Sequence, residues 1–149
     1  RLHLTYIFYE RVYLMDYQKI IDLRNDTNLF AKHLGLYITE MKEGYAKCEM
    51  KISSEHLNPI KAVHGGVLYT IADVTGGAAA SSYGYHLVTA NSDFHYLNAG
   101  LNTSEIYSTA SKLKIGKRLM IFQVSVFDQN NTLLCSGTFT YAPLKQPLL

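Results

Sequence analysis

Hydrophobic residues recur at helical spacing at the start of the chain. Over 16–24 the apolar positions lie on one helical face, and Asp16 stands where an N-cap is expected. A second short helix, capped by Asp26 or Thr27, is predicted to stop at Gly35, because glycine readily adopts the left-handed conformation that ends a helix. The pattern therefore predicts two short helices before the first strand.

From residue 36 the hydrophobic period changes to two, which predicts strands. Segments 36–43 and 45–53 are expected to form a hairpin around Glu43-Gly44. In the second segment the apolar and polar positions alternate as Ala46, Cys48, Met50 and Ile52 against Lys47, Glu49 and Lys51. One face of the hairpin should therefore pack in the core and the other should face water. Cys48 is interpreted as a core residue.

The segment 67–83 is predicted to be the one long helix, and few of its side chains are large. Gly76 and Gly77 each cost about 1 kcal/mol of helix propensity relative to alanine. A helix tolerates such residues when another group packs very close to its backbone. No charged stripe is available to face solvent, so this helix is expected to be buried on nearly all sides.

Four more strands are predicted, over 86–98, 104–115, 118–129 and 132–141, with a tight turn at Asn130-Asn131. No internal repeat, linker or low-complexity tract interrupts the pattern. The order of elements is helix, two strands, buried helix and four antiparallel strands. This order indicates an α+β domain in which an antiparallel sheet curls around a long central helix.

Composition narrows the class of protein. With 149 residues, 48% of them hydrophobic, the chain is long enough for one domain with a hydrophobic core. A net charge of +2 gives no reason to expect nucleic acid as a partner. Two cysteines and no histidine pair at ligand spacing predict neither a disulfide framework nor a metal site, and they favour a reducing, cytoplasmic setting. No apolar run reaches the ~20 residues of a membrane span.

The first fourteen residues are treated separately from the domain. The chain opens at Arg1, and its first apolar stretch is broken by His3 and has no small-residue cleavage site, so a signal peptide is not expected. Met15 offers an alternative start. On that interpretation 1–14 is an upstream extension or remnant, and 15–149 is a single domain.

One carboxylate stands alone in the middle of the chain. No lysine or arginine occurs between Ala62 and Ser111, and Asp73 is the only acid between Glu55 and Asp93. Burying a carboxylate among apolar residues is costly unless it is paired or hydrogen-bonded. The leading interpretation is that Asp73 acts as general base or nucleophile. The alternative is a helix carboxylate tied into a buried structural network.

The motif His64-Gly65-Gly66 precedes the long helix. Its glycines let a ligand approach the backbone closely, and N–H groups at a helix start suit a carbonyl oxygen that becomes an oxyanion. Gly66 and Asp73 are seven residues apart, about 10 Å along a helix, which is too far for both to act on one tetrahedral centre. An antiparallel second copy would bring its helix start near Asp73. The sequence therefore suggests a site shared between two subunits.

Asn58, His64-Gly65-Gly66 and Asp73 at this spacing resemble the hotdog-fold acyl-CoA thioesterases, most closely the phenylacetate-degradation (PaaI-like) type. The resemblance covers about 29–142 and includes four later segments, Phe94-His95-Tyr96-Leu97, Lys117-Arg118, Cys135-Ser136-Gly137-Thr138 and Thr140-Tyr141. It implies a hotdog fold and hydrolysis of aryl- or medium-chain acyl-CoA thioesters to free acid and CoA. It also implies a homodimer or homotetramer and no metal or redox cofactor, with coenzyme A present as part of the substrate.

The same resemblance implies roles for single residues. Asp73 matches the catalytic carboxylate, and the Gly65 N–H matches the group that polarises the thioester carbonyl, with His64 holding the turn. Asn58 matches the asparagine that orients the carbonyl or the attacking water. Thr89 falls where related enzymes have a Ser or Thr that helps to place water. Further contacts with the substrate are expected from the remaining glycine of the motif, Gly66.

A basic cluster brackets Gly116 at a predicted strand-to-strand turn and consists of Lys112, Lys114, Lys117 and Arg118. One interpretation is that these cations meet the anionic phosphates of coenzyme A. The other is a solvated hairpin without a binding role.

Two other functions remain open. A non-catalytic acyl-CoA binder or sensor on the same fold would bind acyl-CoA tightly without turnover. A hotdog hydratase or dehydratase would act on enoyl or hydroxyacyl thioesters, but the His followed by a Pro-Gly turn seen in that group is missing here. A serine hydrolase is not supported, because the chain has no Gly-x-Ser-x-Gly elbow.

Overall fold

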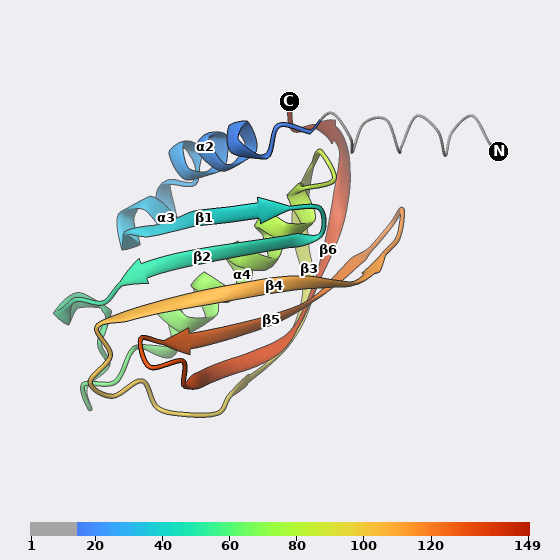
Figure 1. Ribbon diagram of the computed structural model, residues 1–149. Helices are drawn as coiled ribbons and strands as arrows, with labels where there is room; N and C mark the ends of the chain where they lie inside the picture. The colour runs from blue at the N-terminus through green and yellow to red at the C-terminus, as the bar shows by residue number, and fades with distance from the viewer. Residues whose placement is uncertain (1–14) are drawn as a thin grey trace.

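Six antiparallel strands form one curved sheet in the spatial order β1-β2-β4-β5-β6-β3. The computed structural model describes residues 15–149, so the predicted extension over 1–14 lies outside the described residues. The strands are β1 (Leu36–Lys42), β2 (Tyr45–Lys51), β3 (Tyr85–Tyr96), β4 (Glu105–Ile115), β5 (Met120–Asp128) and β6 (Leu133–Pro147). The helices are α2 (Tyr17–Thr27), α3 (Leu29–Leu34) and α4 (Gly65–Ser81), with a short 3-10 turn, η1 (Ser54–His56). Figure 1 shows the sheet curving around α4, with α2 and α3 along β1.

The predicted α+β arrangement is confirmed, and most strand ends agree with the pattern. The largest difference is β6, which continues to Pro147 instead of ending at Tyr141. Beyond Tyr141 it no longer pairs with β5, but it continues to pair with β3, where Pro143 lies opposite Leu87. Proline is tolerated in a strand whose N–H side needs no partner. The extension therefore depends on β3, which is distant in the sequence.

The two N-terminal helices form as predicted, with one correction. Asp16 caps α2 by accepting a hydrogen bond from the N–H of Lys19 at 3.0 Å. The cap of α3 is Asn28, which accepts from the N–H of Ala31 at 3.2 Å, and not Asp26 or Thr27. Both of those residues belong to the last turn of α2, which runs further than its apolar pattern indicates.

The central helix α4 begins and ends two residues earlier than predicted. It begins earlier because the His64 side chain caps it before the glycines. Gly76 and Gly77 are explained by close approach. A Cβ on Gly76 would overlap the Tyr141 hydroxyl, and one on Gly77 would lie 3.3 Å from Nη2 of Arg24. The expectation that other groups pack against this backbone is confirmed.

Alternation along the central strands builds the core. Ala46 and Cys48 on β2 and Phe122, Val124 and Val126 on β5 are all fully buried. Cys48 is a free thiol, and burial raises its pKa to about 12, so it remains protonated at neutral pH. This supports its interpretation as a core residue. Over residues 15–149 no helix is long and apolar enough to cross a membrane.

Candidate active site

The start of α4 leaves one backbone donor open. The Nδ1 atom of the His64 side chain accepts a hydrogen bond from the N–H of Gly66 at 2.8 Å. The backbone carbonyl of His64 accepts one from the N–H of Val67 at 2.9 Å. Across residues 15–149 the N–H of Gly65 has no acceptor. His64 therefore holds the turn and occupies the Gly66 donor. The Gly65 N–H is left to face a ligand, where the helix dipole favours negative charge.

Asn58 is fixed close to this helix start by a small loop. Its Oδ1 accepts from the N–H groups of Ile60 at 3.1 Å and Ala62 at 3.0 Å. An isolated antiparallel bridge between Leu57 and Val63 brings the residue before Asn58 alongside the residue that precedes His64. The backbone N–H of Asn58 donates to the Ala62 carbonyl at 2.8 Å, whereas its side-chain Nδ2 has no acceptor among the residues that the structure describes and is available to donate to a carbonyl or a water.

Asp73 lies in the middle of α4, with one carboxylate oxygen held and the other open. The Thr89 hydroxyl of β3 donates to Oδ1 at 2.9 Å, and the Tyr141 hydroxyl of β6 lies 3.2 Å from the same oxygen. No group within residues 15–149 donates to Oδ2. The carboxylate is thus oriented by two hydroxyls, and its second oxygen is free to take a proton from water or to attack a carbonyl carbon.

Asp73 is half-buried, which corrects the expectation that α4 is enclosed on nearly all sides. The second half of the helix is buried from Thr75 to Ser81, whereas Gly66 and Thr70 share the accessible face with Asp73. These residues are spaced by four and three, so they form one stripe along the helix. Within a single chain the sheet does not reach around to cover this stripe.

Tyr141 is a site residue that the sequence analysis did not identify. Its hydroxyl donates to the Asp73 backbone carbonyl at 2.8 Å and contacts the carboxylate. Burial, followed by the charge of Asp73, raises the pKa of Tyr141 well above its usual value, so the phenol keeps its proton and acts as a donor. The sequence carries two signals for it: Thr140-Tyr141 belongs to the resemblance, and the missing side chain of Gly76 makes room for this hydroxyl.

The predicted residues therefore form two groups in one chain. Asn58, His64 and Gly65 lie together at the start of α4, and Thr89 lies with Asp73 in its middle. Gly65 and Asp73 are eight residues apart in a continuous helix, about 12 Å along its axis. A single chain does not bring the open Gly65 N–H and the open Asp73 oxygen to one reacting atom.

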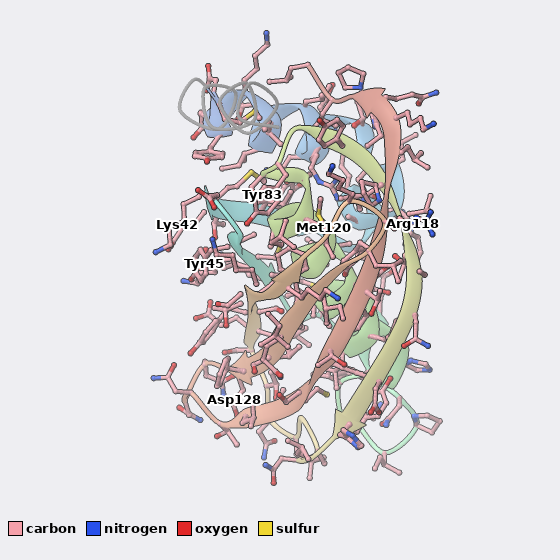
Figure 2. The ribbon with its side chains drawn as sticks, turned by 90° about the vertical axis from the view of Figure 1, so that its right-hand side faces the viewer. Lys42, Tyr45, Tyr83, Arg118, Met120 and Asp128 are labelled. Carbon is pink, nitrogen blue, oxygen red and sulfur yellow. The ribbon has the colours of Figure 1, made fainter. Side chains whose placement is uncertain are left out.

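The basic cluster is divided by its contacts. Lys112 forms an ion pair with Glu43 at 2.9 Å and packs over Gly44, so its charge is engaged. Lys114, Lys117 and Arg118 are exposed and form no ion pair with any residue of 15–149. The cluster lies beyond the C-terminal end of α4, because Lys112 and Tyr83, which follows this helix, both pack at Gly44. Figure 2 labels Tyr83 and Arg118 at this end of the molecule and Asp128 at the opposite end of β5.

The open stripe of α4 lies next to an uncovered edge of the sheet. The order of strands makes β3 an edge strand that pairs with β6 on one side. No strand or helix among residues 15–149 pairs with its other side. Val88 on this strand is 50% exposed, and Tyr96 at its end is 55% exposed. A long edge of this kind is a template for another strand.

The described residues contain no group of three or more His, Cys, Asp or Glu side chains able to hold a metal ion. The side chains of the site are suited to acid–base or nucleophilic chemistry by Asp73, with backbone N–H groups polarising a carbonyl.

Comparison with known proteins identifies a family to which the chain is similar. A family model described as the thioesterase superfamily matches residues 61–135. A protein of Archaeoglobus fulgidus named "Putative esterase" is 32% identical over 103 residues, which cover 68% of this chain and 67% of that protein. The acyl-coenzyme A thioesterase PaaI of Escherichia coli is 29% identical over 99 residues, covering 66% of this chain and 71% of the relative.

Solved structures give the same fold. The E. coli PaaI protein superposes with a TM-score of 0.84 at 22% identity, over 88% of this chain and 95% of that chain. A hypothetical thioesterase of Streptococcus pneumoniae, determined with coenzyme A, superposes with a TM-score of 0.76 at 25% identity, over 83% of this chain and 98% of that chain. The predicted hotdog fold is confirmed.

Proposed function

The chain belongs to the thioesterase superfamily, and on this premise we propose that it hydrolyses acyl-CoA thioesters to a free acid and CoA. The observation that carries the proposal is the Asp73 carboxylate, with Oδ1 held by two hydroxyls and Oδ2 open. The relatives named as acyl-coenzyme A thioesterases and the S. pneumoniae structure with coenzyme A support this choice of substrate. Aryl and medium-chain acyl groups are the first to be tested.

In the proposed reaction the thioester carbonyl carbon is attacked next to Asp73. As a base, Oδ2 takes a proton from the attacking water and passes it to the departing sulfur; as a nucleophile, it bonds to the carbon itself, and the anhydride that remains after CoA has left is hydrolysed by water. The carbonyl oxygen becomes an oxyanion, which accepts a hydrogen bond from the N–H of Gly65. The carbon–sulfur bond breaks and the thiolate leaves as CoA. Asn58 and Thr89 orient the carbonyl and the water.

We assign the two halves of this site to two copies of the chain. The 12 Å between Gly65 and Asp73 on one helix supports this assignment, since the oxyanion donor and the base must lie within about 3 Å of their respective atoms. An antiparallel pairing of two β3 edges would make the two α4 helices antiparallel as well. The Gly65 end of one helix would then approach Asp73 of the other, within a homodimer that is itself able to pair into a tetramer.

The same arrangement accounts for the position of the basic cluster. Lys114, Lys117 and Arg118 lie beyond one end of α4, and Gly65 lies at its other end, about 25 Å away along the 17-residue helix. An antiparallel copy with its Gly65 beside Asp73 would bring that Gly65 to about 12 Å from the end that carries these cations. They are then proposed to bind the CoA phosphates, whereas Lys112 is engaged with Glu43.

Two variants test the chemistry. Asp73→Asn preserves the shape of the side chain but removes the base, so thiol release from a panel of aryl- and alkyl-CoA thioesters is expected to fall by about 100-fold or more. Gly65→Pro removes the proposed oxyanion donor and is tolerated at the first position of a helix. Gly65→Ala keeps the N–H and serves as its control. Release that is equally slow in the wild type and Asp73→Asn would exclude Asp73 as the catalytic residue.

Mixing these variants tests the shared site. Each parent homodimer has only defective sites, but a mixed dimer of Asp73→Asn and Gly65→Pro subunits contains one site with an intact Asp73 and an intact Gly65. Recovery of hydrolysis after subunit exchange is therefore expected. No recovery in a mixture shown to contain mixed dimers would place both groups of each site in one chain.

The leading alternative is a non-catalytic acyl-CoA binder on the same fold. It would bind acyl-CoA with the same cations but release no thiol, and Asp73→Asn would leave its affinity unchanged. A hydratase would instead add water to a crotonyl thioester and leave the carbon–sulfur bond intact. The open oxygen on Asp73 favours hydrolysis over simple binding, because a binding protein gains nothing from an oriented carboxylate beside an uncharged acyl group.

A further inference from the structure

Arg24 places a second charge on the face of α4 that carries Asp73. It comes from the last turn of α2, and its Nη2 lies 3.3 Å from the position that a Cβ on Gly77 would occupy. Gly77 follows Asp73 by one helical turn, about 6 Å along the axis, on the same face of the helix. A larger residue at position 77 would displace the guanidinium, so the absence of a side chain at Gly77 leaves space for the Arg24 guanidinium.

The guanidinium has no anionic partner in this place. Its Nε is sealed from solvent and has no hydrogen-bond acceptor, and Arg24 forms no ion pair within residues 15–149. Tyr141 and Leu87 are its neighbours over Gly77. Burial is the main cause that lowers the pKa of Arg24, opposed by the more distant charge of Asp73. An arginine nonetheless stays protonated at any physiological pH.

Arg24 is half-buried, and sealing its Nε from solvent without an acceptor is destabilising, so the chain loses stability by keeping Arg24 where it is. Asp73 forms no ion pair with the Arg24 guanidinium. Its Oδ1 is instead held by the hydroxyls of Thr89 and Tyr141. A hydroxyl of a substrate would offer a hydrogen bond but would leave the charge uncompensated. A carboxylate offers both, and it matches the planar fork of a guanidinium.

We propose that Arg24 determines acyl specificity by binding a carboxylate at the far end of the acyl group, so that the preferred substrates are thioesters of short dicarboxylic acids. This inference rests on the proposed function, because the thioester carbon is placed beside Asp73. The guanidinium lies about one helical turn further along. At about 1.5 Å per carbon–carbon bond, four zig-zag bonds span about 5 Å, which is the length of a glutaryl group.

The experiment compares two thioesters with acyl groups of equal carbon number, glutaryl-CoA and valeryl-CoA. Wild-type kcat/KM is expected to be about 10- to 100-fold higher for glutaryl-CoA, which is the value of a hydrogen bond to a charged group. Arg24→Met should remove this preference by lowering the glutaryl rate, and should change the valeryl rate by less than about 3-fold. Lys19→Met, on the exposed side of α2, is the control and should retain the wild-type ratio.

Other outcomes would overturn the proposed role of Arg24. A wild-type enzyme that prefers valeryl-CoA, or an Arg24→Met variant that loses both activities equally, would overturn the proposal. Arg24→Lys keeps the charge without the fork and should retain part of the preference, which covers the case in which Arg24→Met fails to fold. If the enzyme hydrolyses members of the aryl- and alkyl-CoA panel but not glutaryl-CoA, the Arg24 proposal is overturned and the proposed function stands; if it hydrolyses no thioester at all, the proposed function fails. Calorimetric binding of the two thioesters then still tests Arg24, with tighter binding of glutaryl-CoA expected in the wild type alone.

Discussion

The two edges of the sheet are completed in different ways. At β1, the helices α2 and α3 lie alongside the strand (Figure 1), and the Asn25 side chain accepts from the Ile38 N–H at 2.9 Å and donates to the Ile38 carbonyl at 3.0 Å. A side chain there takes the place of a neighbouring strand. At β3 the outer side has no such partner within residues 15–149. Residues 15–149 thus close one edge by themselves and leave open the edge beside Asp73.

This difference indicates that the open edge is functional. Stable proteins protect their edges with helices, charges or bulges, and β1 is protected in this way. The β3 edge carries Thr89, which holds Asp73, and Tyr96, whose hydroxyl donates to the Gly65 carbonyl at 3.1 Å. Both halves of the candidate site are thus attached to the open edge strand, where a second copy of the chain would complete them.

The largest expected effect follows from blocking the open edge. The double variant Val88→Glu with Ala90→Glu adds two negative charges to β3. A symmetric pairing of two such strands would bring like charges together, which destabilises the dimer. We expect a monomer by light scattering and a loss of thioester hydrolysis of about 100-fold or more, as for removal of an oxyanion donor. Leu29→Glu, on the exposed α3 surface near the closed edge, should change neither. A fully active monomer would contradict the shared site.

A smaller effect is expected from the two hydroxyls that hold Asp73. Thr89→Val and Tyr141→Phe each remove one hydrogen bond to Oδ1 and retain the shape of the side chain. Each should lower kcat by about tenfold, since a hydrogen bond to a charged group is worth about 1.5–3 kcal/mol before solvent screening. Steady-state kinetics with one thioester measures both. Wild-type kcat in both variants would mean that Asp73 needs no orientation by these groups.

The smallest effect on activity is expected at the closed edge. Asn25→Ala leaves both backbone groups of Ile38 without their partner, which should lower the free energy of unfolding by about 1–3 kcal/mol. The kcat at low temperature should be unchanged, because this edge is remote from Asp73. Urea unfolding measures the loss. Gln18→Ala, which removes an exposed side-chain contact with Asp22 on the same helix, is the control and should have little effect.

Local rules in the sequence were sufficient for most of the helices and strands. The alternation that places Cys48 in the core and the glycine that ends α3 are short-range features, and both are found in the structure. Asp73 and the glycine turn before α4 were predicted from residue type and spacing, whereas the role of Asn58 is implied by the resemblance, and these roles stay predictions. The cap of α3 was predicted wrongly because several polar residues adjacent in the sequence were equally suited to it.

What the sequence determined by itself is the class of fold, the solitary carboxylate and the glycine turn before the long helix. The tertiary structure decided which groups surround that carboxylate. Tyr141 reaches Asp73 across 68 residues, and Arg24 reaches Gly77 from another helix. Such contacts depend on strand order and on the curvature of the sheet, and no periodicity along the chain encodes either one. Hydrophobic patterning decides which face is buried, whereas the closing of the sheet around α4 decides which side chains meet there.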